Sequence, residues 1–169
     1  MRSRLSLLSA CALALLLGAP LPVEAGPLPP ADRVIVVKSK RQLTLMRRGK
    51  VMKNFKISLG REPLGAKRFA GDGRTPEGTY RLTAWNPNSR FHRSIRISYP
   101  MPEDKAAARA FGRSPGGDIM IHGLSAGMRS AGAGHYRFDW TEGCLAVTDA
   151  EMDVIWDSVQ PGTPIEILP

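Results

Sequence analysis

Short apolar segments, separated by glycine- and proline-rich turns, limit the folds that this chain can adopt. The sequence holds 17 glycines and 14 prolines in 169 residues, and such residues interrupt helices and mark turns. Between the turns, β-branched runs and alternating apolar and polar residues have the pattern of β-strands. The expected strands are 33–39, 42–48, 51–59, 79–85, 94–99, 116–123 and 165–168. They predict a mainly β domain of sandwich or open-barrel type.

Two short helices are expected beside these strands. An alanine-rich stretch after Glu103 predicts the first helix, and Gly112 suits its C-terminal end. The second helix, over 148–159, is better marked, because Thr148 and Glu151 match a capping box and apolar residues follow at helical spacing.

Two glycine-rich segments, 60–78 and 124–138, are expected to be long loops. A loop of such length inside a compact domain is usually functional or mobile. No internal repeat and no boundary of a second domain interrupts the chain.

The first 25 residues predict a secretory signal peptide. Arg2 and Arg4 precede an apolar run that is shorter than the about 18 to 20 residues needed to cross a bilayer, and a small-residue cleavage site ends at Ala25. A lipoprotein signal that lipidates Cys11 is the alternative, although the apolar stretch before it is short for that purpose. Both interpretations predict export, to the periplasm or cell wall. On the first, the chain contacts the membrane only through the signal peptide before cleavage.

The rest of the chain divides into a proline-rich linker, 26–32, and one domain, 33–169. Loss of residues 1–25 removes two arginines and one glutamate, which changes the formal net charge from +9 to +8. Outside the cytoplasm such a charge suits an anionic wall polymer or membrane headgroups, with solubility as the alternative. Nucleic acid is not expected as a partner, because the lysines and arginines from Lys38 to Arg74 lie largely in turns and a loop.

Cleavage would also leave Cys144 as the single cysteine of the chain. Such a residue is paired with another molecule, buried and inert, or chemically used, and composition leaves all three open. A nucleophilic thiol needs a base, because a pKa of about 8.5 leaves it mostly protonated at neutral pH. Gly143 precedes the cysteine. It either leaves the amides of Gly143 and Cys144 free to face an oxyanion or merely makes a turn.

Three histidines are candidates for the base. His122 ends the expected strand 116–123 next to Gly123, where a rigid element would hold it. His135 lies in a glycine-rich loop and is a candidate for lining a site, whereas His92 has the setting of a surface residue. The spacing of these residues matches no metal site, and no cofactor is expected.

Two motifs carry a family resemblance. The sequence "IHG" at 121–123, followed by "DWTEGCLAVT" at 139–148, resembles the signature of L,D-transpeptidases with a YkuD-type catalytic domain, in which a histidine precedes a Ser/Thr-x-Gly-Cys motif. The segments "DGRTPEGTYRL" and "EMDVIWDSVQPGTPIEILP" are also similar to parts of that family. The resemblance covers about 33–169 and implies the mainly β catalytic domain of the family.

The resemblance implies roles for five residues. Cys144 would be the nucleophile and His122 the general base and acid. Thr141, Gly143 and Gly123 would shape the site, and the amides around Gly143 and Cys144 would form an oxyanion hole.

The implied reaction is acyl transfer from a peptidoglycan stem peptide. Cys144 would attack the carbonyl of the L-centre of diaminopimelate in a tetrapeptide stem, and D-alanine would leave. An amine of a second stem would then give a 3→3 crosslink, water would make the protein an L,D-carboxypeptidase, and a protein lysine would anchor a lipoprotein. A wall-binding domain with an inert cysteine is the non-enzymatic alternative.

One position departs from the family pattern. Many members carry an arginine two residues after the cysteine, where this chain has Ala146, and a subgroup with the form "DWTxGC" shares this departure. A guanidinium is well suited to bind a carboxylate of the substrate. Because this chain lacks that arginine, the cation that would bind the substrate is unassigned. Arg129 and Arg137 are candidates to replace it.

Overall fold

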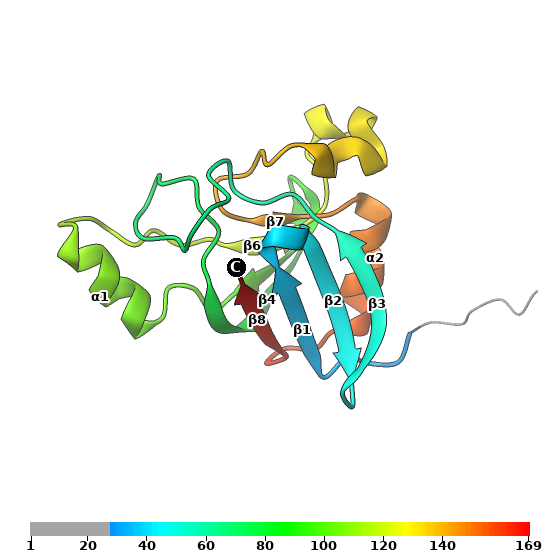
Figure 1. The fold of residues 1–169 in the computed structure, drawn as a ribbon. Coiled ribbons are helices and arrows are strands. Elements are labelled where there is room, and N and C mark those ends of the chain that lie inside the picture. The colour runs from blue at the N-terminus through cyan, green and yellow to red at the C-terminus, as the bar shows by residue number, and fades with distance from the viewer. Residues whose placement is uncertain (1–27) are drawn as a thin grey trace, which may run out of the picture.

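The computed structural model describes residues 28–169, and the predicted signal peptide lies outside the described residues. Eight strands form one sheet in the order β3-β2-β1-β8-β4-β5-β6-β7 (Figure 1). The strands are β1 (Arg33–Val37), β2 (Gln42–Arg47), β3 (Lys50–Lys56), β4 (Gly78–Ser89), β5 (His92–Ile97), β6 (Met120–His122), β7 (Leu145–Ala146) and β8 (Pro164–Leu168). The α-helices are α1 (Pro102–Ala110) and α2 (Asp149–Ser158), and 3-10 turns form η1 (Lys38–Lys40) and η2 (Ala126–Arg137).

The sheet curls so that its two edges approach each other. Ser58 and Gly60, which follow β3, form isolated bridges to Ala146 and Thr141 at the opposite edge. Among the described residues no continuous ladder closes the sheet, so it resembles an open barrel. The prediction of a mainly β, open-barrel-like domain with two short helices is therefore confirmed.

The core lies on the inward face of the curled sheet. Strand alternation brings apolar side chains of β1, β2, β4, β5 and β8 together, and α2 packs its apolar face against β5 and β6. The most deeply buried of these side chains include Val34, Val36, Leu43, Leu45, Leu82, Ile95, Ile97, Met152, Ile155 and Ile165. This core makes the strands that carry the site rigid.

The start of α2 and the end of α1 are formed as the sequence predicts, whereas α1 begins at Pro102, before the alanine-rich stretch. The Thr148 hydroxyl accepts a hydrogen bond from the Glu151 amide at 3.3 Å, and the Glu151 carboxylate accepts one from the Thr148 amide at 2.9 Å. After α1, Gly112 has φ 63° and donates to the Arg109 carbonyl at 2.9 Å. Within residues 28–169, no helix is long and apolar enough to span a bilayer.

Several boundaries differ from the sequence expectations. The strand expected over 79–85 extends to Ser89 as β4, the strand expected over 51–59 ends at Lys56 as β3, and β7 was not expected. The segment 124–138 contains the 3-10 turns of η2 instead of an irregular loop. The expected strand 116–123 keeps only Met120–His122, because Gly116 and Asp118 have positive φ values of 76° and 55°. Packing also begins within the predicted linker, since Ala31 is buried and its amide donates to the Ser158 carbonyl at 2.7 Å.

The segment 60–78 is fastened to the sheet. The Lys38 ammonium is buried and donates to the carbonyl oxygens of Gly65 and Thr75 at 2.6 and 3.1 Å, and to the Glu77 carboxylate at 2.8 Å. Within the segment, Asp72 accepts hydrogen bonds from three backbone amides and pairs with Lys67 at 2.8 Å. These contacts make the segment a fixed wall of the molecule.

Replacing Lys38 with methionine should lower the free energy of unfolding by about 3 kcal/mol, because a partly buried carboxylate and two carbonyls lose their buried partner. Chemical denaturation measures the change. Lys40→Met is the matched control: Lys40 is exposed in the same 3-10 turn, and its loss should change stability by less than about 0.5 kcal/mol. Equal effects of the two variants would contradict this account of the segment 60–78.

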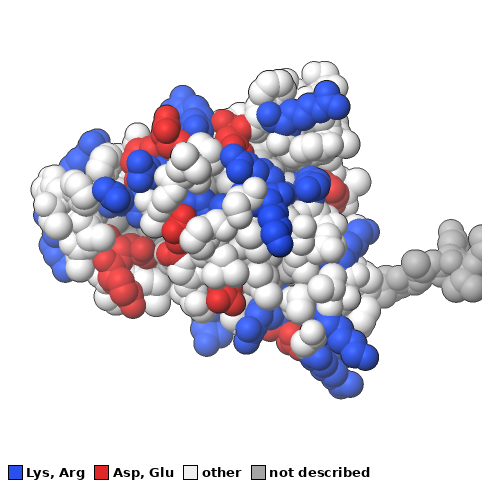
Figure 2. Space-filling model, viewed as in Figure 1, with Lys and Arg blue, Asp and Glu red and all other residues white. Residues whose placement is uncertain are grey.

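Basic side chains do not merge into one patch on the face shown in Figure 2. Lysines and arginines form several separate groups, and acidic side chains lie between them. The net positive charge is therefore dispersed on this face.

Candidate active site

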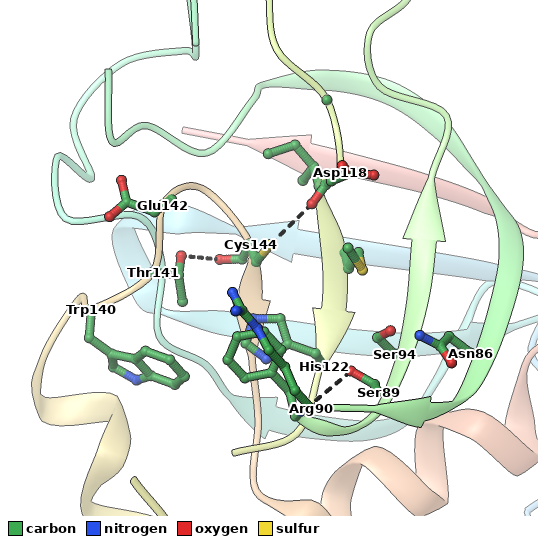
Figure 3. Close-up of a pocket in the computed structure, with 14 residues that line it drawn as sticks. Asn86, Ser89, Arg90, Ser94, Asp118, His122, Trp140, Thr141, Glu142 and Cys144 are labelled. Atoms are coloured by element: carbon green, nitrogen blue, oxygen red, sulfur yellow. Dashed lines mark hydrogen bonds between the residues drawn. The ribbon is translucent and has the colours of Figure 1, made fainter. Parts of the chain in front are cut away.

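A pocket of about 540 Å³ lies at the end of the sheet where β6 and β7 meet (Figure 3). Its volume falls within the range of small-molecule sites. Three segments line it: the hairpin between β4 and β5, the strand β6 with the residues before it, and the turn before β7. The lining residues are Asn86, Ser89, Arg90, Phe91, Ser94, Gly117, Asp118, Ile119, Met120, His122, Trp140, Thr141, Glu142 and Cys144.

Strand register places Cys144 and His122 on one face of the sheet. The parallel strands β6 and β7 pair Ile121 with Leu145 and His122 with Ala146. Cys144 directly precedes β7, two residues before Ala146, and alternate residues of a strand share a face. The two side chains are thus diagonal neighbours on adjacent strands, and both line the pocket (Figure 3).

The His122 imidazole is held in one tautomer. Its Nδ1 lies 2.7 Å from the Gly123 carbonyl oxygen, which can only accept a hydrogen bond, so Nδ1 carries the proton. The ring is buried, and burial lowers the pKa of His122 to about 4. At neutral pH the imidazole is therefore uncharged, and its Nε2 is free to accept a proton.

The surroundings of the Cys144 thiol favour its protonated form. Its Sγ lies 3.4 Å from the Asp118 carbonyl oxygen, to which the thiol donates. Burial raises the pKa of Cys144, while the Met120 amide and the charges of Lys67 and Arg90 act in the opposite direction. A thiolate and imidazolium pair would need the thiol pKa to lie below the imidazole pKa, and here burial moves the two values apart. The arrangement suits proton transfer to a neutral base during attack.

The turn before Cys144 is organised by the Thr141 hydroxyl. It accepts a hydrogen bond from the Gly143 amide at 3.1 Å and donates to the Cys144 carbonyl at 2.8 Å. Gly143 has φ 127°, and a Cβ at this position would lie 2.5 Å from the Arg74 carbonyl oxygen. Only glycine fits this turn without displacement of the backbone.

One expectation for this turn is wrong. The sequence suggested that the amides of both Gly143 and Cys144 could be free to face an oxyanion. The Gly143 amide instead donates to Thr141, because the threonine hydroxyl closes a local turn over it. Of the two amides, only that of Cys144 remains a candidate for this task.

Gly123 allows β6 to approach the start of α2. A Cβ on this residue would lie 2.6 Å from the Asp149 carboxylate and 2.8 Å from the Phe91 carbonyl oxygen. The same carboxylate accepts the Leu124 amide at 2.8 Å. This close packing fixes the Gly123 carbonyl that orients His122.

The model of the YkuD family, described as the L,D-transpeptidase catalytic domain, matches residues 31–167. The chain belongs to this family.

Known proteins similar to this YkuD domain are longer than the matched region. YafK of Escherichia coli (strain K12), named as a candidate L,D-transpeptidase, is 27% identical over 128 residues, which cover 70% of this chain and 44% of YafK. The helical cell shape determining protein Pgp2 of Campylobacter jejuni has a similar fold, with a TM-score of 0.58 and 22% identity over 79% of this chain and 46% of Pgp2. Bd1075 of Bdellovibrio bacteriovorus also has a similar fold, with a TM-score of 0.57 and 19% identity over 82% of this chain and 48% of Bd1075. The chain thus spans less than half the length of each.

The structure brings only some of the residues predicted for the YkuD domain into the pocket. Cys144, His122 and Thr141 line it, and Gly143 and Gly123 adjoin it. These residues come from two segments that the sheet brings together.

The other predicted residues lie elsewhere. Arg129 is exposed and pairs with Asp149 at 3.2 Å, and Arg137 is exposed at the end of η2. His135 is fully buried, with its Nδ1 3.0 Å from the Ser58 hydroxyl. None of these three side chains is among those that line the pocket. His92, expected at the surface, is partly exposed and pairs with Asp153 at 2.7 Å.

The pocket also contains a cation that the sequence did not single out. Arg90 lies at the tip of the β4–β5 hairpin, within the polar stretch "NPNSRFHRS". A polar turn between two strands indicates a hairpin tip, but it does not indicate that the tip reaches the cysteine. Among residues 28–169, no cluster of His, Cys, Asp and Glu side chains has the geometry to hold a metal ion.

Proposed function

We propose that this YkuD domain transfers acyl groups of peptidoglycan stem peptides through a thioester on Cys144. The observation that carries the proposal is the fixed tautomer of His122, which leaves an unprotonated Nε2 in the pocket that Cys144 also lines. A neutral base and a thiol that line the same pocket are the two groups that general-base catalysis of nucleophilic attack requires, and the thiol must turn from the Asp118 carbonyl oxygen to reach Nε2.

In the first step, Sγ forms a bond to the carbonyl carbon of the L-centre of diaminopimelate in a tetrapeptide stem. The thiol proton moves to Nε2 of His122. Collapse of the tetrahedral intermediate breaks the carbon–nitrogen bond, and His122 returns the proton to the leaving amine. D-Alanine departs, and the acyl group stays on Cys144 as a thioester.

The developing oxyanion needs a hydrogen-bond donor in this step. We assign this to the Cys144 amide, because the neighbouring Gly143 amide donates to Thr141. Thr141 then acts by holding the turn that aims the Cys144 amide.

In the second step, an acceptor attacks the carbonyl carbon of the thioester and gives a proton to His122. The carbon–sulfur bond then breaks, and His122 returns the proton to Sγ of Cys144. An amine of a second stem produces a 3→3 crosslink, and a lysine of a protein produces an anchored lipoprotein. With water as acceptor the same residues hydrolyse stem peptides, which is the L,D-carboxypeptidase alternative.

We place this reaction outside the cytoplasm, in the periplasm or cell wall, with residues 1–25 as the signal peptide, followed by a linker and by a catalytic domain that includes Ala31. The apolar run after Arg2 and Arg4 and the membership of a peptidoglycan-modifying family support this location. The similarity to Pgp2, a protein that determines helical cell shape, favours a role in cell shape.

The test is to incubate the purified protein with disaccharide-tetrapeptide and to follow the masses of products. Release of D-alanine with a crosslinked dimer is expected for the transpeptidase, and release without dimer would identify the carboxypeptidase. The Cys144→Ala variant is the control and should release no D-alanine. A wild-type protein that is folded but inactive, and that still binds peptidoglycan as well as Cys144→Ala does, would establish the non-catalytic wall-binding alternative.

A further inference from the structure

Arg90 extends from the β4–β5 hairpin across the candidate active site. The guanidinium lies 4.8 Å from the centroid of the Phe91 ring, and this ring stacks on the His122 imidazole at 4.3 Å with an angle of 24° between the planes. In Figure 3 the Arg90 side chain points from the hairpin toward Cys144. The stack therefore places a cation on the His122 side of the pocket.

The charge of Arg90 is free for a ligand. The two acidic side chains of the pocket, Asp118 and Glu142, pair with Arg96 and Arg61 respectively. Among residues 28–169, Arg90 forms no ion pair with a carboxylate. An exposed guanidinium at the mouth of a pocket, with both acids of that pocket already paired, is suited to an anionic group of the substrate.

Position 146 does not supply this cation. Ala146 is fully buried, and its amide and carbonyl both bond to the backbone of Ser58 at 3.0 Å. Arg129 and Arg137 do not line the pocket. Arg90 is thus the arginine that the fold delivers to the cysteine, and it comes from a different element than the family signature predicts.

We propose that Arg90 binds the terminal carboxylate of the residue that leaves in the acyl-transfer reaction. This inference rests on the proposed function. His122 must reach the leaving nitrogen in order to protonate it, so the leaving residue lies on the His122 side of the pocket. Its carboxylate is separated from that nitrogen by one carbon atom, and the Arg90–Phe91–His122 stack puts the guanidinium on the same side.

The inference predicts that the site distinguishes a free C-terminus from a blocked one. A stem tetrapeptide that ends in a carboxylate should be cleaved about 10- to 100-fold more efficiently, in kcat/KM, than the same peptide ending in a carboxamide. The Arg90→Gln variant should have a kcat/KM for the acid peptide that is lower by this factor. Its kcat/KM for the carboxamide should change by less than about threefold. Arg90→Lys keeps the charge without the two-pronged geometry and should fall between the two.

Two controls separate a binding role from a general one. Arg137→Gln also removes an exposed arginine and should keep the wild-type preference for the acid. Thermal unfolding of Arg90→Gln should stay close to that of the wild type, because the exposed side chain forms no ion pair and only its contact with the Phe91 ring is lost. If Arg90→Gln lowers kcat/KM on the acid and the carboxamide by the same factor, Arg90 does not recognise the carboxylate, although the proposed function stands.

A binding measurement makes the inference testable without turnover. In the Cys144→Ala protein, calorimetry should show tighter binding of the acid peptide than of the carboxamide, and the double variant with Arg90→Gln should bind both alike. Equal affinities of the two peptides for Cys144→Ala would overturn the inference. A preference for the acid that depends on Arg90, in a chain whose wild type cleaves neither peptide, would support the carboxylate site and overturn the proposed function.

Discussion

Replacing His122 with glutamine should slow acylation of Cys144 by about 10³-fold, because general-base catalysis contributes factors of this order. Glutamine keeps a polar side chain on β6 but has no nitrogen that can take the thiol proton. Single-turnover mass spectrometry with a tetrapeptide stem measures the rate at which the thioester forms. A fall of less than tenfold would mean that another group accepts the proton.

The pH dependence of the same rate tests the burial of His122. Acylation requires the uncharged form of His122, and burial lowers the pKa of this residue to about 4. The uncharged form is therefore present above pH 4 and is lost as the pH falls through that value. The rate should therefore be insensitive to protonation of His122 between about pH 5 and 7. An inflection near 6.5, the pKa of an exposed imidazole, would contradict a buried neutral base.

His92→Gln is the matched control for this experiment. His92 begins β5 and pairs with Asp153 on the side of α2, outside the residues that line the pocket. Its replacement should leave the acylation rate within about threefold of the wild type, since it alters a partly exposed pair of small energetic value.

The second large effect is expected at Gly143. An alanine there would place its Cβ 2.5 Å from the Arg74 carbonyl oxygen and would have to adopt φ 127°. Strain and overpacking together should lower the free energy of unfolding by about 3 kcal/mol or more, which corresponds to a fall in Tm of about 10 °C. Acylation should fall by about 10²-fold or more, because displacement of the turn moves Sγ.

Gly127→Ala provides the comparison. Gly127 lies in η2, has an ordinary φ, and a Cβ added to it meets no other atom within 4 Å. This variant should keep the wild-type Tm and rate. A Gly143→Ala protein that is as stable and as active as Gly127→Ala would show that the turn tolerates a side chain, and the account given for Gly143 would be wrong.

The parts of the fold that local rules determine were predictable from the sequence. The capping box of Thr148 and Glu151 depends on residues three apart, and the strands β1, β2 and β3 follow from alternation and short turns. The contraction of the strand 116–123 was not predictable, because positive φ is uncommon outside glycine and nothing local marks Asp118 as one of the exceptions.

The residues of the candidate site also differ in how far the sequence predicts them. Cys144 and His122 stand out because their motifs are local and specific, whereas their placement on one face depends on the pairing of β6 with β7. Arg90 belongs to the pocket only through the curl of the sheet and the reach of a hairpin. His135 shows the opposite error: its glycine-rich surroundings suggested a site, yet the residue is buried against Ser58.

The position of β8 determines when this domain can finish folding. β8 pairs with β1 on one side and with β4 on the other, so it alone joins the half-sheet β1–β3 to the half-sheet β4–β7 through continuous ladders (Figure 1). Because β8 is the last strand in the chain, residues 164–168 are synthesised after all the other strands. Until then, the edges of β1 and β4 that will pair with β8 stay open. Completion of the domain must therefore follow synthesis of β8, and before that point the two half-sheets are held together by no continuous ladder.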